Sequence, residues 1–146
     1  MDVQEYLKQG YLLDQRINYH LRRLEETKNM IDGVNSPLIR PDKVKTSPDG
    51  EAPYVKAYLK MAELNERINQ EIDLLFDLRN QIDEVLRTVR SEKHRMVLLY
   101  RYIEGRTWED IGIMLNADKS TVKRWHQEAL QMVKMPENPI VIQNMP

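Results

Sequence analysis

A row of polar and cationic side chains between positions 119 and 127 has residue types and spacing that suit a chemical task. Its members recur at helical spacing, so one helix would place them on a single face: Lys119, Ser120, Lys123, Arg124 and Gln127. Such side chains suit the DNA major groove, which offers acceptors on base edges and charge on phosphates. The sequence therefore predicts a DNA-reading helix that begins near residue 119.

The residues before this helix have the pattern of a helix-turn-helix. Thr107 is a candidate N-cap for a first helix, and Asp110 follows three residues later, as in a capping box. Asn116 falls at the turn, where a left-handed residue is usual, and Asp118 can cap the second helix through its carboxylate. Gly112 adjoins the apolar stripe, where a small residue lets two helices cross closely.

We expect two groups of DNA contacts. Lys123 and Arg124 would dominate by binding a phosphate or a guanine edge, and the start of the first helix would hold phosphates. The full predicted set is Arg106, Thr107, Trp108, Lys119, Ser120, Thr121, Lys123, Arg124 and Gln127. Trp125 is expected in the core, and His126 either packs against the first helices or touches a phosphate.

No pattern of residues in the chain indicates catalysis or cofactor binding. Cysteine is absent, and His20, His94 and His126 are scattered without metal-ligand spacing. The sequence contains no Gly-rich phosphate loop, serine elbow or nucleotide fingerprint. We therefore predict a protein that is not an enzyme, with no catalytic residue, metal or cofactor.

Composition favours a helical protein of the cytoplasm that does not associate with a membrane. The longest purely apolar run, Met96 to Tyr100, is too short to span a bilayer, and the first ten residues lack the pattern of a signal peptide. The chain of 146 residues has a net charge of −1, but residues 92–135 hold eight Lys/Arg against six Asp/Glu. This weak positive excess predicts modest DNA affinity that relies on dimerisation or on a partner protein.

Two long periodic segments must position the motif. Residues 2–31 and 54–90 carry aliphatic side chains at three- and four-residue intervals, with Glu71 at one inward position of the second segment. Residues 32–53 hold four Pro and two Gly and are predicted to be a disordered loop. We expect an antiparallel helical hairpin over residues 1–91, whose leftover apolar surface supports a homo-oligomer.

The remaining elements complete an all-α fold. A helix over 92–104 is expected to follow the long helix with only a kink near Arg90-Ser91, and to form a trihelical domain over 92–134 with the two motif helices. Residues 135–146 hold three Pro and are predicted to be a flexible tail or a clasp on the surface. The fold class is thus a long helical hairpin followed by a C-terminal helix-turn-helix domain.

The string YIEGRTWEDIGIMLNADKSTVKRWHQEAL, residues 102–130, resembles the region-four domain of bacterial sigma factors. The whole layout, with STVKRWHQEAL near its end, resembles the phage late-transcription regulators of the RinA/ArpU type. These regulators occur in temperate phages and prophages of Gram-positive bacteria. The resemblance implies DNA binding upstream of late genes, carried here by Lys119, Ser120, Lys123, Arg124 and Gln127. His126 departs from the sigma pattern, which usually has an apolar residue there.

The sequence therefore favours a sequence-specific transcription regulator that binds double-stranded DNA in a bacterial cell and activates phage late genes. One alternative is a DNA-packaging subunit similar to the small terminases, which also join a helix-turn-helix to oligomerising helices. Another is a sigma-like module that docks on RNA polymerase without reading DNA.

Overall fold

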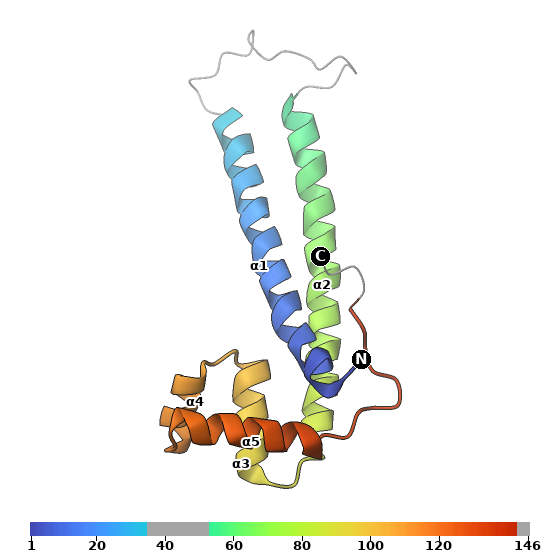
Figure 1. Cartoon of the computed structure of the whole chain (residues 1–146). Helices are drawn as coiled ribbons and strands as arrows, with labels where there is room; N and C mark the ends of the chain where they lie inside the picture. The colour runs from blue at the N-terminus through green and yellow to red at the C-terminus, as the bar shows by residue number, and fades with distance from the viewer. Residues whose placement is uncertain (35–52, 143–146) are drawn as a thin grey trace. The chain divides into compact units, whose positions relative to one another are not determined.

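The computed structural model describes residues 1–34 and 53–142, and the regular structure in these ranges is helical. In chain order the elements are α1 (Val3–Val34), α2 (Pro53–Leu86), α3 (Glu92–Leu98), the π-helical turn η2 (Leu99–Ile103), α4 (Trp108–Leu115) and α5 (Lys119–Met132) (Figure 1). The predicted all-α fold is confirmed. Most of the loop predicted to be disordered, residues 35–52, lies outside the described residues. Within the described ranges, no helix is apolar over a length that would cross a bilayer.

The contacts divide the chain into two compact units, residues 15–73 and residues 1–14 with 74–146. The sequence-based boundary at residue 91 assigned the whole hairpin to one domain. The contacts instead assign both of its chain ends to the unit that holds α3, η2, α4 and α5. Gly10 illustrates why, because the start of α1 packs closely on α2 and η2 at this residue. A Cβ added to Gly10 would lie 3.7 Å from Ile82 and 3.9 Å from the Tyr102 carbonyl oxygen.

The unit of residues 15–73 is an antiparallel pair of helical segments from α1 and α2. Ile17, Ile31 and Ile68 are buried at the expected heptad positions. Glu71, the expected polar interruption, is also buried, and its Oε1 lies 3.0 Å from Arg16 Nε and 3.6 Å from His20 Nε2. The Arg16 guanidinium offsets part of the cost of burying the Glu71 charge, although Glu71 Oε2 has no hydrogen-bond partner among the described residues.

The other unit begins with a reciprocal capping box and includes a clasped tail. At the start of α1, Asp2 Oδ1 accepts from the Glu5 backbone N–H at 2.7 Å, and Glu5 accepts from Asp2 N at 3.4 Å. The amide of Gln9 donates to Ile140 O at 2.9 Å and accepts from Ile142 N at 2.7 Å. Gln81 does the same with Asn138 O and Ile140 N, both at 2.9 Å. Of the two interpretations of the tail, these bonds favour the clasp over the flexible end as far as residue 142.

The connection between α2 and α3 differs from the predicted kink. α2 ends at Leu86, four residues before the expected end, and Thr88 Oγ1 donates to Val85 O at 2.6 Å. The chain leaves helical geometry over residues 87–91, and α3 begins at Glu92 as expected. Val89 is fully buried, and its carbonyl accepts from Arg95 Nη1 at 3.2 Å, so the break is packed into the unit.

The predicted helix over 92–104 forms, but its second half is a π-helical turn. α3 covers Glu92–Leu98 and η2 covers Leu99–Ile103, where the Glu104 N–H donates to Leu99 O at 3.2 Å. Such i to i+5 turns are rare and often occur at functional sites. The extra residue per turn changes the direction in which the side chains from Tyr100 onward point.

Candidate nucleic-acid interface

The first motif helix begins at the predicted cap. Thr107 has extended backbone angles, and its Oγ1 accepts from the Asp110 backbone N–H at 3.1 Å. This bond satisfies one of the otherwise unpaired N–H groups of the first turn. Glu109 and Asp110 in that turn place negative charge near the positive end of the helix.

The turn between α4 and α5 explains the small residue and the asparagine. Asn116 adopts the left-handed conformation, with φ 54° and ψ 50°, and ends α4. The Ala117 N–H donates to Gly112 O at 2.8 Å and the Asn116 N–H to Ile113 O at 3.4 Å, which is a Schellman motif. A Cβ on Gly112 would lie 2.6 Å from the Ala117 carbonyl oxygen, so this turn has no room for a larger residue.

The second motif helix, α5, begins at the predicted Asp118 cap. The Asp118 Oδ1 atom accepts from the Thr121 backbone N–H at 2.9 Å and from Ser120 Oγ at 3.2 Å. These hydrogen bonds hold the pKa of the Asp118 carboxyl below its usual value, so the cap stays ionised at neutral pH. The geometry fixes the start of the helix that carries the predicted contacts.

A small apolar core supports the outward face of α5. Val97 of α3, Ile111 of α4 and Val122 of α5 are fully buried together, and α5 packs on both other helices. The half-buried side chains against this core are Tyr100, Trp108, Leu115, Ala117 and Trp125. Trp125 thus joins the core as expected, with Lys93 Nζ 4.9 Å from its ring centroid.

His126 is buried behind α5, so the alternative of a phosphate contact was wrong. Its side chain is enclosed by aromatic rings, with Tyr102 Oη 2.7 Å from Nε2 and the Trp108 ring centroid 4.8 Å away. Burial, helped by the charges of Arg101 and Lys8, lowers its pKa from 6.5 to about 4. At neutral pH His126 is therefore an uncharged core residue that links η2, α4 and α5.

The predicted DNA-contact residues lie mostly on the surface of this unit. Seven are exposed: Arg106, Thr107, Lys119, Ser120, Lys123, Arg124 and Gln127. Trp108 and Thr121 are half-buried, because the first packs on the core and the second follows the Asp118 cap. The row on α5 is opposite the buried side chains of Val122, His126 and Ala129. The helix thus has one polar face and one buried face, as the spacing predicts.

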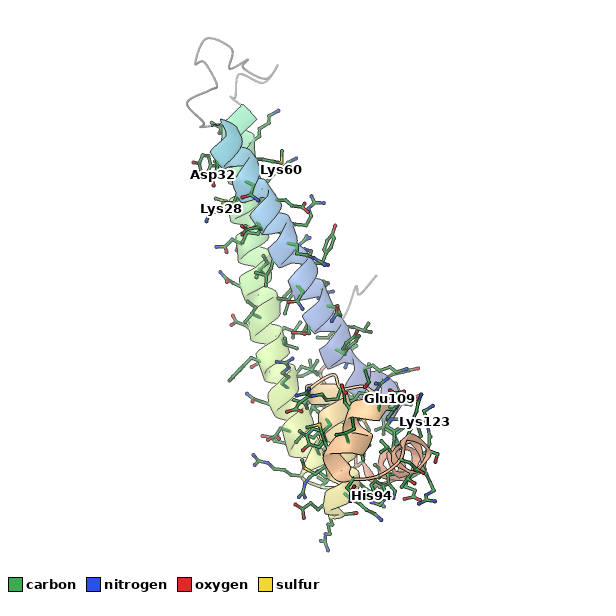
Figure 2. All side chains as sticks on the ribbon, turned by 90° about the vertical axis from the view of Figure 1, so that its left-hand side faces the viewer. Lys28, Asp32, Lys60, His94, Glu109 and Lys123 are labelled. Atoms are coloured by element: carbon green, nitrogen blue, oxygen red, sulfur yellow. The ribbon has the colours of Figure 1, made fainter. Side chains whose placement is uncertain are left out.

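Sequence reasoning missed the carboxylates that accompany these cations. Glu109 Oε1 lies 2.7 Å from Lys119 Nζ, and Figure 2 shows Glu109 close to Lys123 as well, a proximity consistent with the charge of Lys123 acting on the pKa of Glu109. Before the start of α4, Glu104 Oε2 lies 3.5 Å from Arg106 Nε. Lys123 itself forms no ion pair with any residue that the structure describes. Surface pairs of this kind are weak, so a phosphate can replace the carboxylate at small cost.

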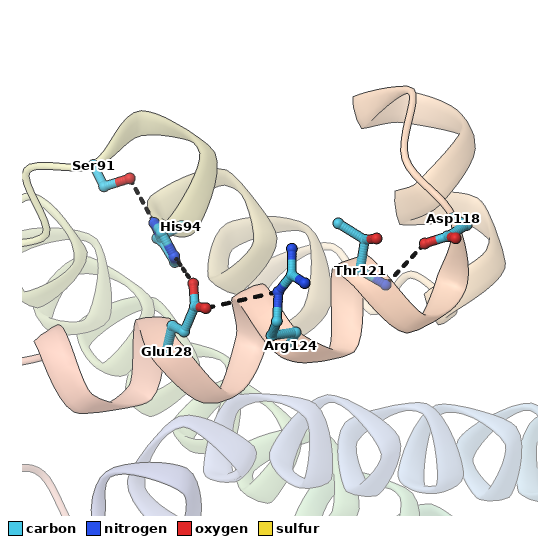
Figure 3. A network of polar contacts seen from close by, with 6 residues as sticks. All are labelled: Ser91, His94, Asp118, Thr121, Arg124 and Glu128. Atoms are coloured by element: carbon cyan, nitrogen blue, oxygen red, sulfur yellow. Dashed lines mark hydrogen bonds and ion pairs between the residues drawn. The ribbon is translucent and has the colours of Figure 1, made fainter.

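A chain of polar contacts joins α3 to the cation at the middle of α5 (Figure 3). The Ser91 Oγ and His94 Nδ1 atoms lie 2.5 Å apart, and His94 Nε2 donates to Glu128 Oε2 at 2.6 Å. The other carboxylate oxygen, Oε1, lies 3.8 Å from Arg124 Nε. The His94 hydrogen bond is the main cause that lowers the pKa of Glu128. The buried histidine thereby fixes the carboxylate that neighbours Arg124.

Within residues 1–34 and 53–142, no three His, Asp or Glu side chains are grouped so that they could hold a metal ion.

Comparison with known proteins places the chain in one family. A family model with the description "Protein of unknown function (DUF722)" matches residues 13–135. This range includes every residue predicted to contact DNA, from Arg106 to Gln127. No curated protein and no solved structure matches the chain.

Proposed function

The chain belongs to this DUF722 family, and we propose that it is a transcription regulator that reads a specific duplex DNA sequence with α5. One observation carries the proposal. The exposed row of Lys119, Ser120, Lys123, Arg124 and Gln127 stands on a helix whose start, turn and opposite face are each fixed by hydrogen bonds or core packing. A helix that is held by its cap and core packing and exposes cations on one face is what major-groove reading requires.

The contacts are assigned by chemistry and position. Arg124, 67% of whose side chain is exposed, can make a bidentate contact with a guanine edge or a phosphate. Lys123 supplies an exposed positive charge. Ser120 donates to Asp118, so the Ser120 oxygen remains an acceptor for a base amino group. The start of α4, with Arg106, Thr107 and Trp108, would contact the phosphate backbone.

The resemblance to the RinA/ArpU type supports the biological part of the proposal. The protein would act in the cytoplasm of a bacterial host, bind upstream of phage late genes and activate them. The charge excess at this end of the chain is small, so we also propose that the hairpin helices pair two copies, which doubles the number of phosphate contacts.

A different observation supports a second candidate function. On α4, Ile113 is 81% exposed and Met114 43% exposed, although both are large apolar side chains. An exposed apolar pair on the first motif helix suits a protein partner. It favours the alternative in which the domain docks on RNA polymerase and α5 does not read DNA.

Selection of bound duplexes from a random library tests the proposed function. We expect the intact chain to enrich one sequence motif. The variant Arg124→Ala should relax the preference at one base pair, because a bidentate arginine contributes about 1–3 kcal/mol of discrimination. The matched variant Arg22→Ala, which alters the unit of residues 15–73, should enrich the same motif as the parent. Enrichment of no motif by the parent, together with capture of polymerase, would support the docking function instead.

A further inference from the structure

A cavity beside the start of α4 has no part in the contacts proposed for α5. It encloses about 510 Å³ within the unit of residues 1–14 and 74–142. Its lining residues are Gln4, Lys8, Tyr11, Leu12, Arg101, Tyr102, Gly105, Thr107 and Trp108. This volume is in the range of small-molecule sites.

The apolar part of the lining is open to a ligand. Tyr11 is 49% exposed and Leu12 48% exposed, and these large side chains lie in successive positions of α1 at the cavity. Single exposed apolar residues need no explanation, but two that line a concave surface form an apolar wall. A flat ring of a ligand would cover both.

The charged part of the lining is entirely positive. Lys8 and Arg101 are its ionised side chains, and it contains no carboxylate. Both cations line the same cavity, and their charges also help burial to lower the pKa of His126. The negative charge of Asp2 helps to raise the pKa of Tyr102, but Asp2 does not line the cavity. Two cations that line one cavity without a carboxylate among its lining residues are suited to bind an anion.

The polar side of the cavity is held in place before any ligand arrives. The Arg101 guanidinium lies 4.1 Å from the centroid of the Trp108 ring, and its Nη1 donates to Arg106 O at 2.9 Å. The π-helical turn η2 carries Arg101 and Tyr102, and Gly105 next to it has φ 67°, which favours glycine. An arginine fixed by stacking and by a backbone bond loses little freedom on binding.

We propose that this cavity is a binding site for a small aromatic anion, such as an aromatic carboxylate, sulfonate or phosphate. The acidic group contacts Lys8 and Arg101, and the ring lies against Tyr11 and Leu12. The site does not depend on the function proposed for α5, although Thr107 and Trp108 belong to both regions. The chain would thus have a place for a small-molecule effector next to its candidate DNA interface.

Titration with 8-anilinonaphthalene-1-sulfonate, an aromatic sulfonate, tests the site on the intact chain without DNA. We expect one bound probe per chain, with energy transfer from tryptophan that is reduced in Trp108→Phe and not abolished, because Trp125 in the same unit remains a donor. Lys8→Gln should raise the Kd of the probe about tenfold, as for loss of one charge-assisted contact. Tyr11→Ser should also raise it. Lys123→Gln, which removes the same charge on α5, should leave the Kd unchanged.

The outcome that overturns the proposal is equally specific. If Lys8→Gln and Tyr11→Ser both bind the probe as the parent does, the probe occupies another apolar surface and the cavity is not its site. Both substitutions replace exposed side chains on α1, and circular dichroism establishes that each variant is folded. Because no DNA is present, this result is separate from success or failure of the proposed DNA binding.

Discussion

At the scale of residues, the candidate interface is a surface of partly neutralised cations. Glu109 forms an ion pair with Lys119, and Glu104 forms one with Arg106. Glu128 contacts both His94 and Arg124. Each carboxylate lies beside a cation that the proposed DNA contact would use. Under the proposed function, these acidic side chains would compete with DNA phosphates for the cations, and salt would shift that competition.

Removal of one of these carboxylates should strengthen DNA binding. Glu109→Gln releases Lys119 from its 2.7 Å ion pair and removes a negative charge from the interface. We expect the affinity for duplex DNA at low ionic strength to rise about fivefold. The lost surface ion pair is weak, and the freed Lys119 ammonium can bind a phosphate without competition from Glu109. Fluorescence anisotropy measures this change, with Glu63→Gln in the unit of residues 15–73 as the control. An unchanged or lower affinity would exclude Lys119 from the contacts.

Burial of His126 should make the stability of the fold depend on pH. Its pKa is about 4 in the folded chain and 6.5 when exposed, so between these values the unfolded chain binds more protons. The free energy of unfolding should then fall as the pH falls from 6.5, by about 2 kcal/mol at a pH of about 5. Denaturant titrations measure it. In His126→Gln, which keeps a partner for Tyr102, this pH dependence should be smaller; equal dependence in both chains would contradict the assignment.

At the scale of elements, the sequence predicts what local rules decide. Thr107, Asn116 and Asp118 occupy the cap and turn positions that their side chains suggest, because each rule concerns neighbours within four residues. The π-helical turn at Leu99–Ile103 and the non-helical residues 87–91 were not predicted. Both depend on tertiary packing. Val89 and Tyr102 are buried at these places, but their residue types would suit an ordinary helix equally well.

The exposed face of α2 should mediate pairing of two chains. Tyr58, Ala62, Asn65, Asn69 and Ile72 are all exposed and recur at intervals of four and three residues, which is the spacing of a second coiled-coil seam. We expect sedimentation equilibrium to give the mass of a dimer, and Ile72→Glu to shift the equilibrium toward the monomer. Glu63→Gln, outside this seam, should leave the dimer intact. A monomer at every concentration of the parent chain would contradict pairing.

At the scale of the whole molecule, the division into units was harder to predict than the helices. Periodicity identifies two long helices, but it does not reveal that residues 1–14 and 74–86 share a unit with α3, η2, α4 and α5. Nor do sequence rules predict the tail bonds from Gln9 and Gln81, which join positions more than fifty residues apart. The Glu109–Lys119 pair and the contact of Glu128 with His94 belong to the same class, since only the folded arrangement brings these residues together, whereas i,i+4 spacing on α5 already pairs Glu128 with Arg124.

The dependence of DNA affinity on salt tests the central claim most directly. If α5 and the start of α4 neutralise about four phosphates, the logarithm of the affinity should fall against the logarithm of salt concentration with a slope of about −4. Lys123→Gln should reduce the magnitude of this slope by about one, whereas Lys28→Gln in the unit of residues 15–73 should leave it unchanged. A slope near zero, or a slope that Lys28→Gln alters and Lys123→Gln does not, would contradict DNA binding by this face of α5.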